Sequence, residues 1–144
     1  MPTISLRPAT HDDRATVERI YFETQRWIIE ELFGWRGEAI ERGKFADFYD
    51  EANTKIIVVG GESAGWVTVK QASDISVDSL YLGSAFQRKG IGSILLRLII
   101  EQAQESKLTL RINTAKVNPA RALYERLGFV LVSEDAFKVY FELK

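Results

Sequence analysis

Residues 87–92 read Gln87-Arg88-Lys89-Gly90-Ile91-Gly92 and join a predicted strand, Ile75–Leu82, to a predicted apolar helix, Ile91–Ser106. Two glycines one residue apart allow a tight turn with exposed backbone amides. At a helix N-terminus these amides and the helix dipole favour an anion, and Arg88 and Lys89 add positive charge. The hexapeptide therefore fits a pyrophosphate-binding loop, and it fits equally well a turn that only begins a core helix. It is neither a Walker loop nor a complete Rossmann fingerprint.

A second motif runs from residue 118 to residue 129 and reads Asn118-Pro119-Ala120-Arg121-Ala122-Leu123-Tyr124-Glu125-Arg126-Leu127-Gly128-Phe129. Asn118 suits the N-cap of a short helix and Pro119 its first position, whereas Gly128 suits its end. By spacing alone, Tyr124 is a core aromatic residue. Taken singly, this motif predicts only a capped helix.

The remaining patterns predict an alternation of strands and helices. Thr10 is expected to begin a helix that continues to Gly34, and a second helix should carry Ile40, Phe45, Phe48 and Tyr49. The segment 91–106 is apolar nearly all round, which is typical of a buried helix. The further strands are expected at 3–7, 55–59, 65–70, 108–112, 129–132 and 137–143. The order is β-α-α-β-β-β-α-β-α-β-β, and the strands on either side of helix 91–106 should be parallel.

Composition limits the possible classes of function. The 144 residues predict one domain, 1–144, and their net charge of −1 offers no general attraction to nucleic acid or to a membrane. The chain has no cysteine and one histidine, His11, so we expect no disulfide, no thiolate chemistry and no metal site. The N-terminus lacks a signal-peptide pattern, and the longest apolar run is too short to span a bilayer. We therefore expect a soluble, cytoplasmic protein.

Together, the two motifs resemble motifs A and B of the GNAT superfamily of N-acetyltransferases, and the order of elements extends the resemblance over nearly the whole chain. The resemblance implies a single-domain α/β fold with helices flanking a mixed central β-sheet, which is splayed between the fourth and fifth strands. It implies transfer of an acetyl group from acetyl-coenzyme A to the primary amine of a small molecule or a protein. It does not determine the acceptor, the acyl chain length or whether the protein forms a homodimer.

The resemblance also implies roles for individual residues. The coenzyme A pyrophosphate would lie on the loop of residues 87–93, and backbone groups of residues 80–82 would hold the pantetheine and polarise the thioester carbonyl. Asn113 would lie at the opening between the splayed strands, Asn118 would seat the pantetheine, and Tyr124 would lie near the sulfur. The implied cofactor-binding residues are Leu80, Tyr81, Leu82, Gln87, Arg88, Lys89, Gly90, Ile91, Gly92, Ser93, Asn113, Asn118, Arg121 and Tyr124.

In the implied chemistry, the N–H of Leu82 stabilises the oxyanion and Tyr124 protonates the departing thiolate, because thiol and tyrosine pKa values of about 8.5 and 10 are close. Loss of the phenolic proton should then limit the rate at high pH. The base is less well defined. The family's glutamate position is Ser76 here, which leaves Asp78, a first-helix glutamate (Glu23, Glu30 or Glu31) or, as the expected case, ordered water.

One position departs from the family pattern. Many members carry proline two residues after the strand that precedes motif A, whereas this chain has Ser84. We expect the difference to alter the stiffness of the loop and not the chemistry. The alternative function is a non-catalytic module that senses acyl-coenzyme A or scaffolds a partner, but such a binder has no need of an acid at the sulfur.

Overall fold

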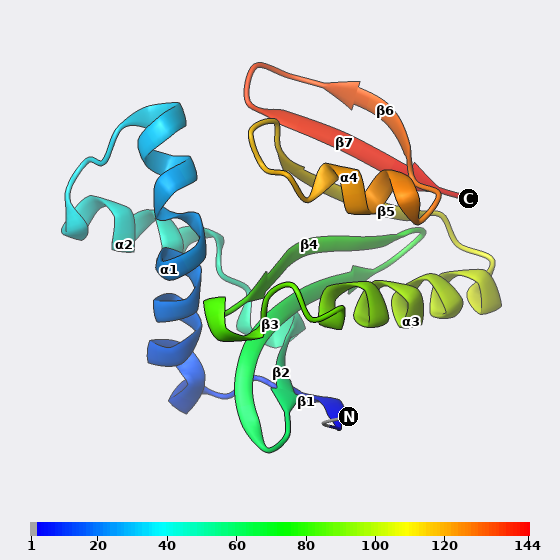
Figure 1. Cartoon of the computed structure of the whole chain (residues 1–144), viewed down its shortest axis with the longest axis horizontal. Helices are drawn as coiled ribbons and strands as arrows, with labels where there is room; N and C mark the ends of the chain where they lie inside the picture. The colour runs from blue at the N-terminus through cyan, green and yellow to red at the C-terminus, as the bar shows by residue number, and fades with distance from the viewer. Residues whose placement is uncertain (1–2) are drawn as a thin grey trace. The chain divides into compact units, whose positions relative to one another are not determined.

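The computed structural model describes residues 3–144, and its elements follow the predicted order (Figure 1). Three short 3-10 helices, at His11–Asp13, Glu51–Asn53 and Ser84–Phe86, are additional to the prediction. The helices and strands are β1 (Ile4–Pro8), α1 (Arg14–Phe33), α2 (Glu38–Phe48), β2 (Thr54–Val59), β3 (Glu62–Gln71), β4 (Ile75–Leu82), α3 (Ile91–Ser106), β5 (Leu110–Ala115), α4 (Arg121–Arg126), β6 (Val130–Glu134) and β7 (Lys138–Leu143).

The strands form one mixed sheet in the order β1-β2-β3-β4-β5-β7-β6. Strands β4 and β5 are parallel, which confirms the prediction from the crossover helix between them. Their pairing joins Ile75–Val77 to Leu110–Ile112, at the beginning of both strands. The later residues of β5 continue to pair with β7 as far as Ala115. The predicted α/β class with a mixed sheet is thus confirmed, and the short β4–β5 pairing agrees with a splay at this point.

Contacts divide the chain into two compact units, and β3 and β4 each contribute residues to both. The first unit contains residues 1–68 and 79–87, and the second contains residues 69–78 and 88–144. The loop of motif A therefore begins in the first unit with Gln87 and continues in the second with Arg88.

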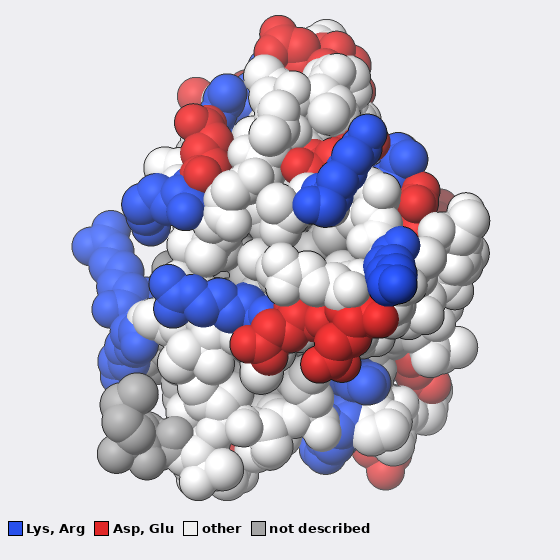
Figure 2. Space-filling model, turned by 90° about the vertical axis from the view of Figure 1, so that its right-hand side faces the viewer, with Lys and Arg blue, Asp and Glu red and all other residues white. Residues whose placement is uncertain are grey.

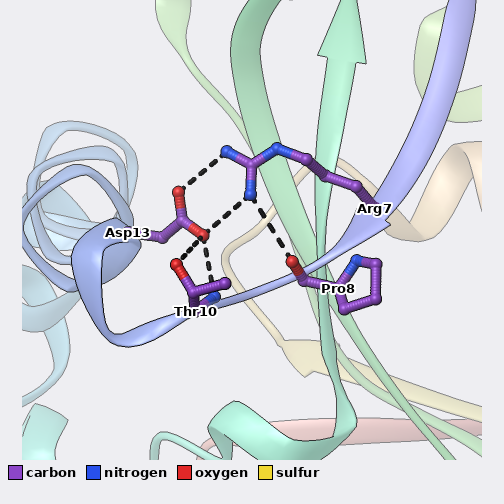
Figure 3. A network of polar contacts seen from close by, with 4 residues as sticks. All are labelled: Arg7, Pro8, Thr10 and Asp13. Atoms are coloured by element: carbon purple, nitrogen blue, oxygen red, sulfur yellow. Dashed lines mark hydrogen bonds and ion pairs between the residues drawn. The ribbon is translucent and has the colours of Figure 1, made fainter.

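In the first unit, a polar network joins β1 to the beginning of α1 (Figure 3). The Thr10 amide donates to Asp13 Oδ2 at 2.8 Å, in a capping box that begins the turn preceding α1. Arg7 donates from both terminal nitrogens to the Asp13 carboxylate, at 2.8 and 2.9 Å. The hydrogen bond from Arg7 lowers the pKa of Asp13 to about 2. Asp13 therefore supports the folded state above pH 4, and this support is lost as the pH falls toward 2.

Aromatic side chains form the core of the first unit. Trp66 on β3 is fully buried, and its ring lies 6.2 Å from that of Phe45 on α2 and 5.0 Å from that of Tyr81 on β4. Tyr21 on α1 packs against Phe45 at 5.1 Å and against Tyr81 at 5.5 Å. These contacts attach both helices to the end of β4, where residues 80–82 lie.

The aromatic residues between Trp27 and Tyr49 are buried to different degrees. Phe45 is buried, and Trp35 and Tyr49 are half-buried, whereas Trp27, Phe33 and Phe48 are exposed. The buried residues of α1 are Val17, Ile20, Ile28 and Ile29.

In the second unit, α3 buries one face and not its whole circumference. Ile91, Leu95, Leu96, Ile99 and Ala103 are buried, whereas Leu98 is 54% exposed. The prediction of an all-round buried helix is thus wrong, because Leu98 stays exposed. On α4, Tyr124 contacts Phe141 of β7 at 5.8 Å, so α4 packs on the β5–β7 part of the sheet (Figure 1).

Figure 2 shows acidic and basic side chains interspersed on the face that it presents, in keeping with the net charge of −1. Among residues 3–144, no helix has both the length and the apolarity that a membrane span requires.

Candidate acetyl-coenzyme A site

In the loop of motif A, the backbone just before α3 contains two residues with positive φ angles. Gly90 is the N-cap of α3 with φ +79°, a conformation that suits glycine, and Arg88 precedes it with φ +61°. The helix's first hydrogen bond runs from the Ile94 amide to the Gly90 carbonyl, at 3.1 Å. The amides of Ile91, Gly92 and Ser93 therefore belong to the first turn, which has no intrahelical acceptors for them. A Cβ added to Gly90 would meet no atom within 4 Å, so this backbone is open to a ligand.

The backbone of Leu82 is oriented by a close approach of β4 to β3. A Cβ built on Gly65 would lie 2.1 Å from the Tyr81 oxygen and 3.0 Å from the Tyr81 carbonyl carbon. Because the oxygen is nearer than the carbon, the Tyr81 carbonyl points toward Gly65. In a trans peptide the N–H points the opposite way, so the Leu82 N–H is directed away from β3. The Leu82 N–H, to which the resemblance assigns stabilisation of the oxyanion, therefore does not donate a hydrogen bond to β3.

Sequence reasoning missed Gly65, although a signal for it exists. A glycine inside a strand often marks a place where another backbone comes close. Here it stands beside Trp66 in a run of buried residues, Ala64–Thr68, and its neighbour across the sheet is the Tyr81 carbonyl. Gly65 therefore belongs to the set of residues that shape the candidate site.

Replacing Gly65 with alanine should destabilise the protein by about 1–3 kcal/mol, the usual cost of overpacking, because the new Cβ would overlap backbone atoms that cannot rotate away. Denaturant unfolding checks this value. Gly43→Ala is the matched control, because Gly43 lies inside α2 with nothing within 4 Å of the new Cβ. That control should be stabilised by up to about 1 kcal/mol. Equal stabilities of Gly65→Ala and the parent protein would contradict the close approach.

Three further backbone and side-chain bonds hold the turn after β4. The Gln87 side-chain amide donates to the Leu82 carbonyl at 2.8 Å, and the Gly83 amide donates to the Ala64 carbonyl at 2.8 Å. The Ser84 amide donates to Glu23 Oε1 on α1 at 2.7 Å. Leu80, Tyr81 and Leu82 are half-buried, while Gln87 is exposed. The predicted residues of the first unit are therefore brought together around one turn.

The motif B residues lie in the second unit. Asn118 is half-buried, and its Oδ1 accepts the Ala120 amide at 2.9 Å. The helix α4 itself begins at Arg121, so the predicted start at Asn118–Pro119 is two residues early, and Asn118 instead caps the turn that leads into α4. Because Oδ1 is engaged, the amide nitrogen of Asn118 is the group left to donate. Arg121 pairs with Glu125 at 3.5 Å, and Asn113 Oδ1 accepts from Lys138 at 3.5 Å.

Tyr124 is 7% exposed, and its ring packs against Phe129 and Phe141 at centroid distances of 6.0 and 5.8 Å. Burial raises its pKa to about 12, because the phenolate is poorly solvated there. The hydroxyl therefore keeps its proton across the range in which enzymes are assayed. The loss of rate at high pH that an ordinary tyrosine would cause should therefore occur only above that range.

Three of the four candidate bases, Asp78, Glu23 and Glu30, are engaged in other contacts. Asp78 pairs with Lys70 at 3.2 Å and accepts from the Ser76 hydroxyl. Glu30 pairs with Arg26 at 2.8 Å. Glu23 accepts from Ser84 and from Arg19, and the bond from Ser84 lowers its pKa, which makes it a weaker base. These contacts favour water as the base.

Comparison with known proteins finds one matching family model and several solved structures of similar fold. A model of the acetyltransferase (GNAT) family matches residues 13–129, and a search of curated protein sequences gives no match. Among solved structures, PaiA N-acetyltransferase from Thermoplasma acidophilum, in complex with coenzyme A, is 17% identical with a TM-score of 0.79, covering 99% of both chains. The ribosomal-protein-S18-alanine N-acetyltransferase from Escherichia coli is 18% identical with a TM-score of 0.70, covering 98% of this chain and 93% of its own. Naa50 from Arabidopsis thaliana, in complex with the bisubstrate analogue CoA-Ac-MVNAL, is 14% identical with a TM-score of 0.66, covering 98% of both chains.

Proposed function

Because the chain belongs to the GNAT family of acetyltransferases, we propose that it transfers the acetyl group of acetyl-coenzyme A to a primary amine by direct attack on the thioester. The observation that carries the proposal is the open, left-handed N-cap at Gly90, which leaves the first amides of α3 available to the pyrophosphate. Arg88 and Lys89 add positive charge to the same loop.

In the proposed reaction, the neutral amine attacks the carbonyl carbon and the C–S bond breaks as the amide forms. A lysine-like amine has a pKa near 10.4, so fewer than about one molecule in a thousand is neutral at pH 7. Water takes the proton that the attacking nitrogen loses. The Leu82 N–H, which points away from β3, stabilises the oxyanion, and the thiolate regains a proton to leave as coenzyme A.

Tyr124 serves the departing sulfur as a hydrogen-bond donor in this proposal. Its pKa of about 12 is well above the thiol value of about 8.5, so complete transfer of the phenolic proton to the thiolate is uphill. A hydrogen bond that strengthens as charge develops on sulfur avoids this cost. The final proton of the thiol then comes from solvent.

The test is release of free thiol from acetyl-coenzyme A in the presence of separate amine classes. The panel contains a polyamine, free amino acids, an aminoglycoside, a lysine-containing peptide with a blocked N-terminus, and peptides that begin with alanine or methionine. The two peptide N-termini are included because relatives of the same fold are named for an alanine N-terminus or bind the analogue CoA-Ac-MVNAL. Amine-dependent thiol release with an acetylated product supports the proposal. Tight binding of acetyl-coenzyme A without turnover on any amine would favour the sensing module instead.

A further inference from the structure

The hydrogen bond between Glu23 and Ser84 joins residues 61 positions apart, and both belong to the first unit. Glu23 Oε1 accepts the Ser84 amide at 2.7 Å, while Oε2 accepts from Arg19 at 3.1 Å. Both carboxylate oxygens are thus engaged. The Glu23 side chain is 32% exposed, and its pKa is lowered by hydrogen bonding from the side chain and then the amide of Ser84, so it is ionised when it holds this amide.

The Ser84 amide is one of three consecutive backbone groups that are held by different parts of the unit. The Leu82 carbonyl is held by the side chain of Gln87, the Gly83 amide by the Ala64 carbonyl of β3, and the Ser84 amide by Glu23 of α1. Two of these bonds come from neighbouring loop or strand residues. The bond from Glu23 is the contribution of α1 to the position of the turn.

The backbone at this turn already has the geometry that a proline requires. Gly83 has φ −58° and ψ +152°, the extended conformation that suits a residue before proline. Ser84 is the first residue of a 3-10 helix, a position at which the fixed φ of proline is favoured and its missing N–H is tolerated. This chain has serine at the position and uses the serine N–H to bind Glu23.

We propose that Glu23 is a positioning residue: it fixes Gly83–Ser84 and, through them, the Leu82 amide. The inference rests on the proposed function, because it matters to catalysis only if Leu82 meets the oxyanion. Glu23 is then not the general base, although it is a carboxylate close to the strand end. It follows that the Ser84→Pro substitution should make Glu23 dispensable, because the proline ring would then fix the turn.

The experiment is a mutant cycle in steady-state kinetics with one working acceptor. Glu23→Ala should lower kcat by about 10- to 100-fold, since a misplacement of about 1 Å can cost about 100-fold, with little change in KM for acetyl-coenzyme A. Glu23→Gln keeps an acceptor oxygen and should retain most of kcat. Ser84→Pro alone should retain turnover, because the Glu23 side chain can then turn toward solvent. The double variant Glu23→Ala/Ser84→Pro should recover most of the kcat that Glu23→Ala loses.

The matched control is Glu18→Ala. Glu18 also lies on α1 and is paired with an arginine, Arg42, at 3.2 Å, and its side chain is 22% exposed. The Glu18→Ala variant should lose about as much stability as Glu23→Ala, with no change in kcat. Thermal unfolding of every variant separates misfolding from a kinetic effect. Hydrogen exchange at the Ser84 amide should lose protection in Glu23→Ala and keep it in Glu23→Gln.

The outcomes separate the two proposals. A double variant no faster than Glu23→Ala would overturn the positioning role, and if Glu23→Gln were then as slow as Glu23→Ala, Glu23 would be the base. An unchanged kcat in Glu23→Ala would also overturn it while leaving the acetyltransferase activity intact. Absence of turnover in the parent protein would instead overturn the proposed function itself, and with it the catalytic meaning of the Glu23–Ser84 bond.

Discussion

Replacing Gly90 with glutamate should abolish detectable binding of coenzyme A while the protein remains folded. Gly90 has φ +79°, so a side chain here costs about 1–2 kcal/mol in backbone strain, but nothing within 4 Å obstructs its Cβ. The new side chain would therefore extend into the space where the pyrophosphate is proposed to lie. It would bring negative charge against negative charge and cover the amides that begin α3.

Calorimetric titration with coenzyme A measures this effect, and unfolding by denaturant confirms that the variant is folded. Gly90→Gln is the matched control, because it has the same size and the same strain without the charge. Glutamine should weaken binding less than glutamate, and the difference between the two should shrink as salt rises. Affinity unchanged in the glutamate variant would remove residues 87–93 from the site.

Replacing Tyr124 with phenylalanine should lower kcat by about 10²–10³-fold, the usual cost of removing one preorganised hydrogen-bond donor from the transition state. The ring contacts with Phe129 and Phe141 remain, so the variant should fold normally. KM for acetyl-coenzyme A should change little, because the hydroxyl matters most when charge develops on sulfur.

The pH profile gives a second readout for Tyr124. Since burial raises its pKa to about 12, the phenol is protonated at every pH up to about 10, and the ratio of parent to variant kcat should be constant over that range. Tyr140→Phe is the control: it removes a hydroxyl that donates to Asp135 at 2.8 Å, and it should leave kcat unchanged. Near-normal turnover in Tyr124→Phe would make this tyrosine a core residue only, with no part in stabilising the charge on sulfur.

The regular elements could be predicted from the sequence because their causes are local. The strand Ile75–Leu82 and the helix Ile91–Ser106 have the bounds that the apolar pattern and the glycine turn predict. Gly34 ends α1 as expected, with its amide bonded to the Glu30 carbonyl. The loop at Gly90 could also be recognised, because a left-handed N-cap before a long helix needs only residues that are adjacent in the chain.

The buried faces were predicted less well, because burial depends on which partners a helix meets. Trp27 and Leu98 have the spacing and chemistry of core residues, yet both are exposed. Hydropathy assigns an apolar residue to the interior in general but does not say which side of a helix has a neighbour. That choice is made only when α1 and α3 pack on their strands.

The decisive features of the site depend on residues far apart in the chain. The direction of the Leu82 amide follows from Gly65, which lies on another strand, and the turn after it is held by Glu23 from α1. No local pattern distinguishes Glu23 from Glu30, another glutamate on the same helix that pairs with an arginine. The raised pKa of Tyr124 likewise arises from burial and not from its neighbours in sequence. Backbone conformation is set by neighbouring residues, whereas amide direction, desolvation and long-range hydrogen bonds exist only once distant segments have come together.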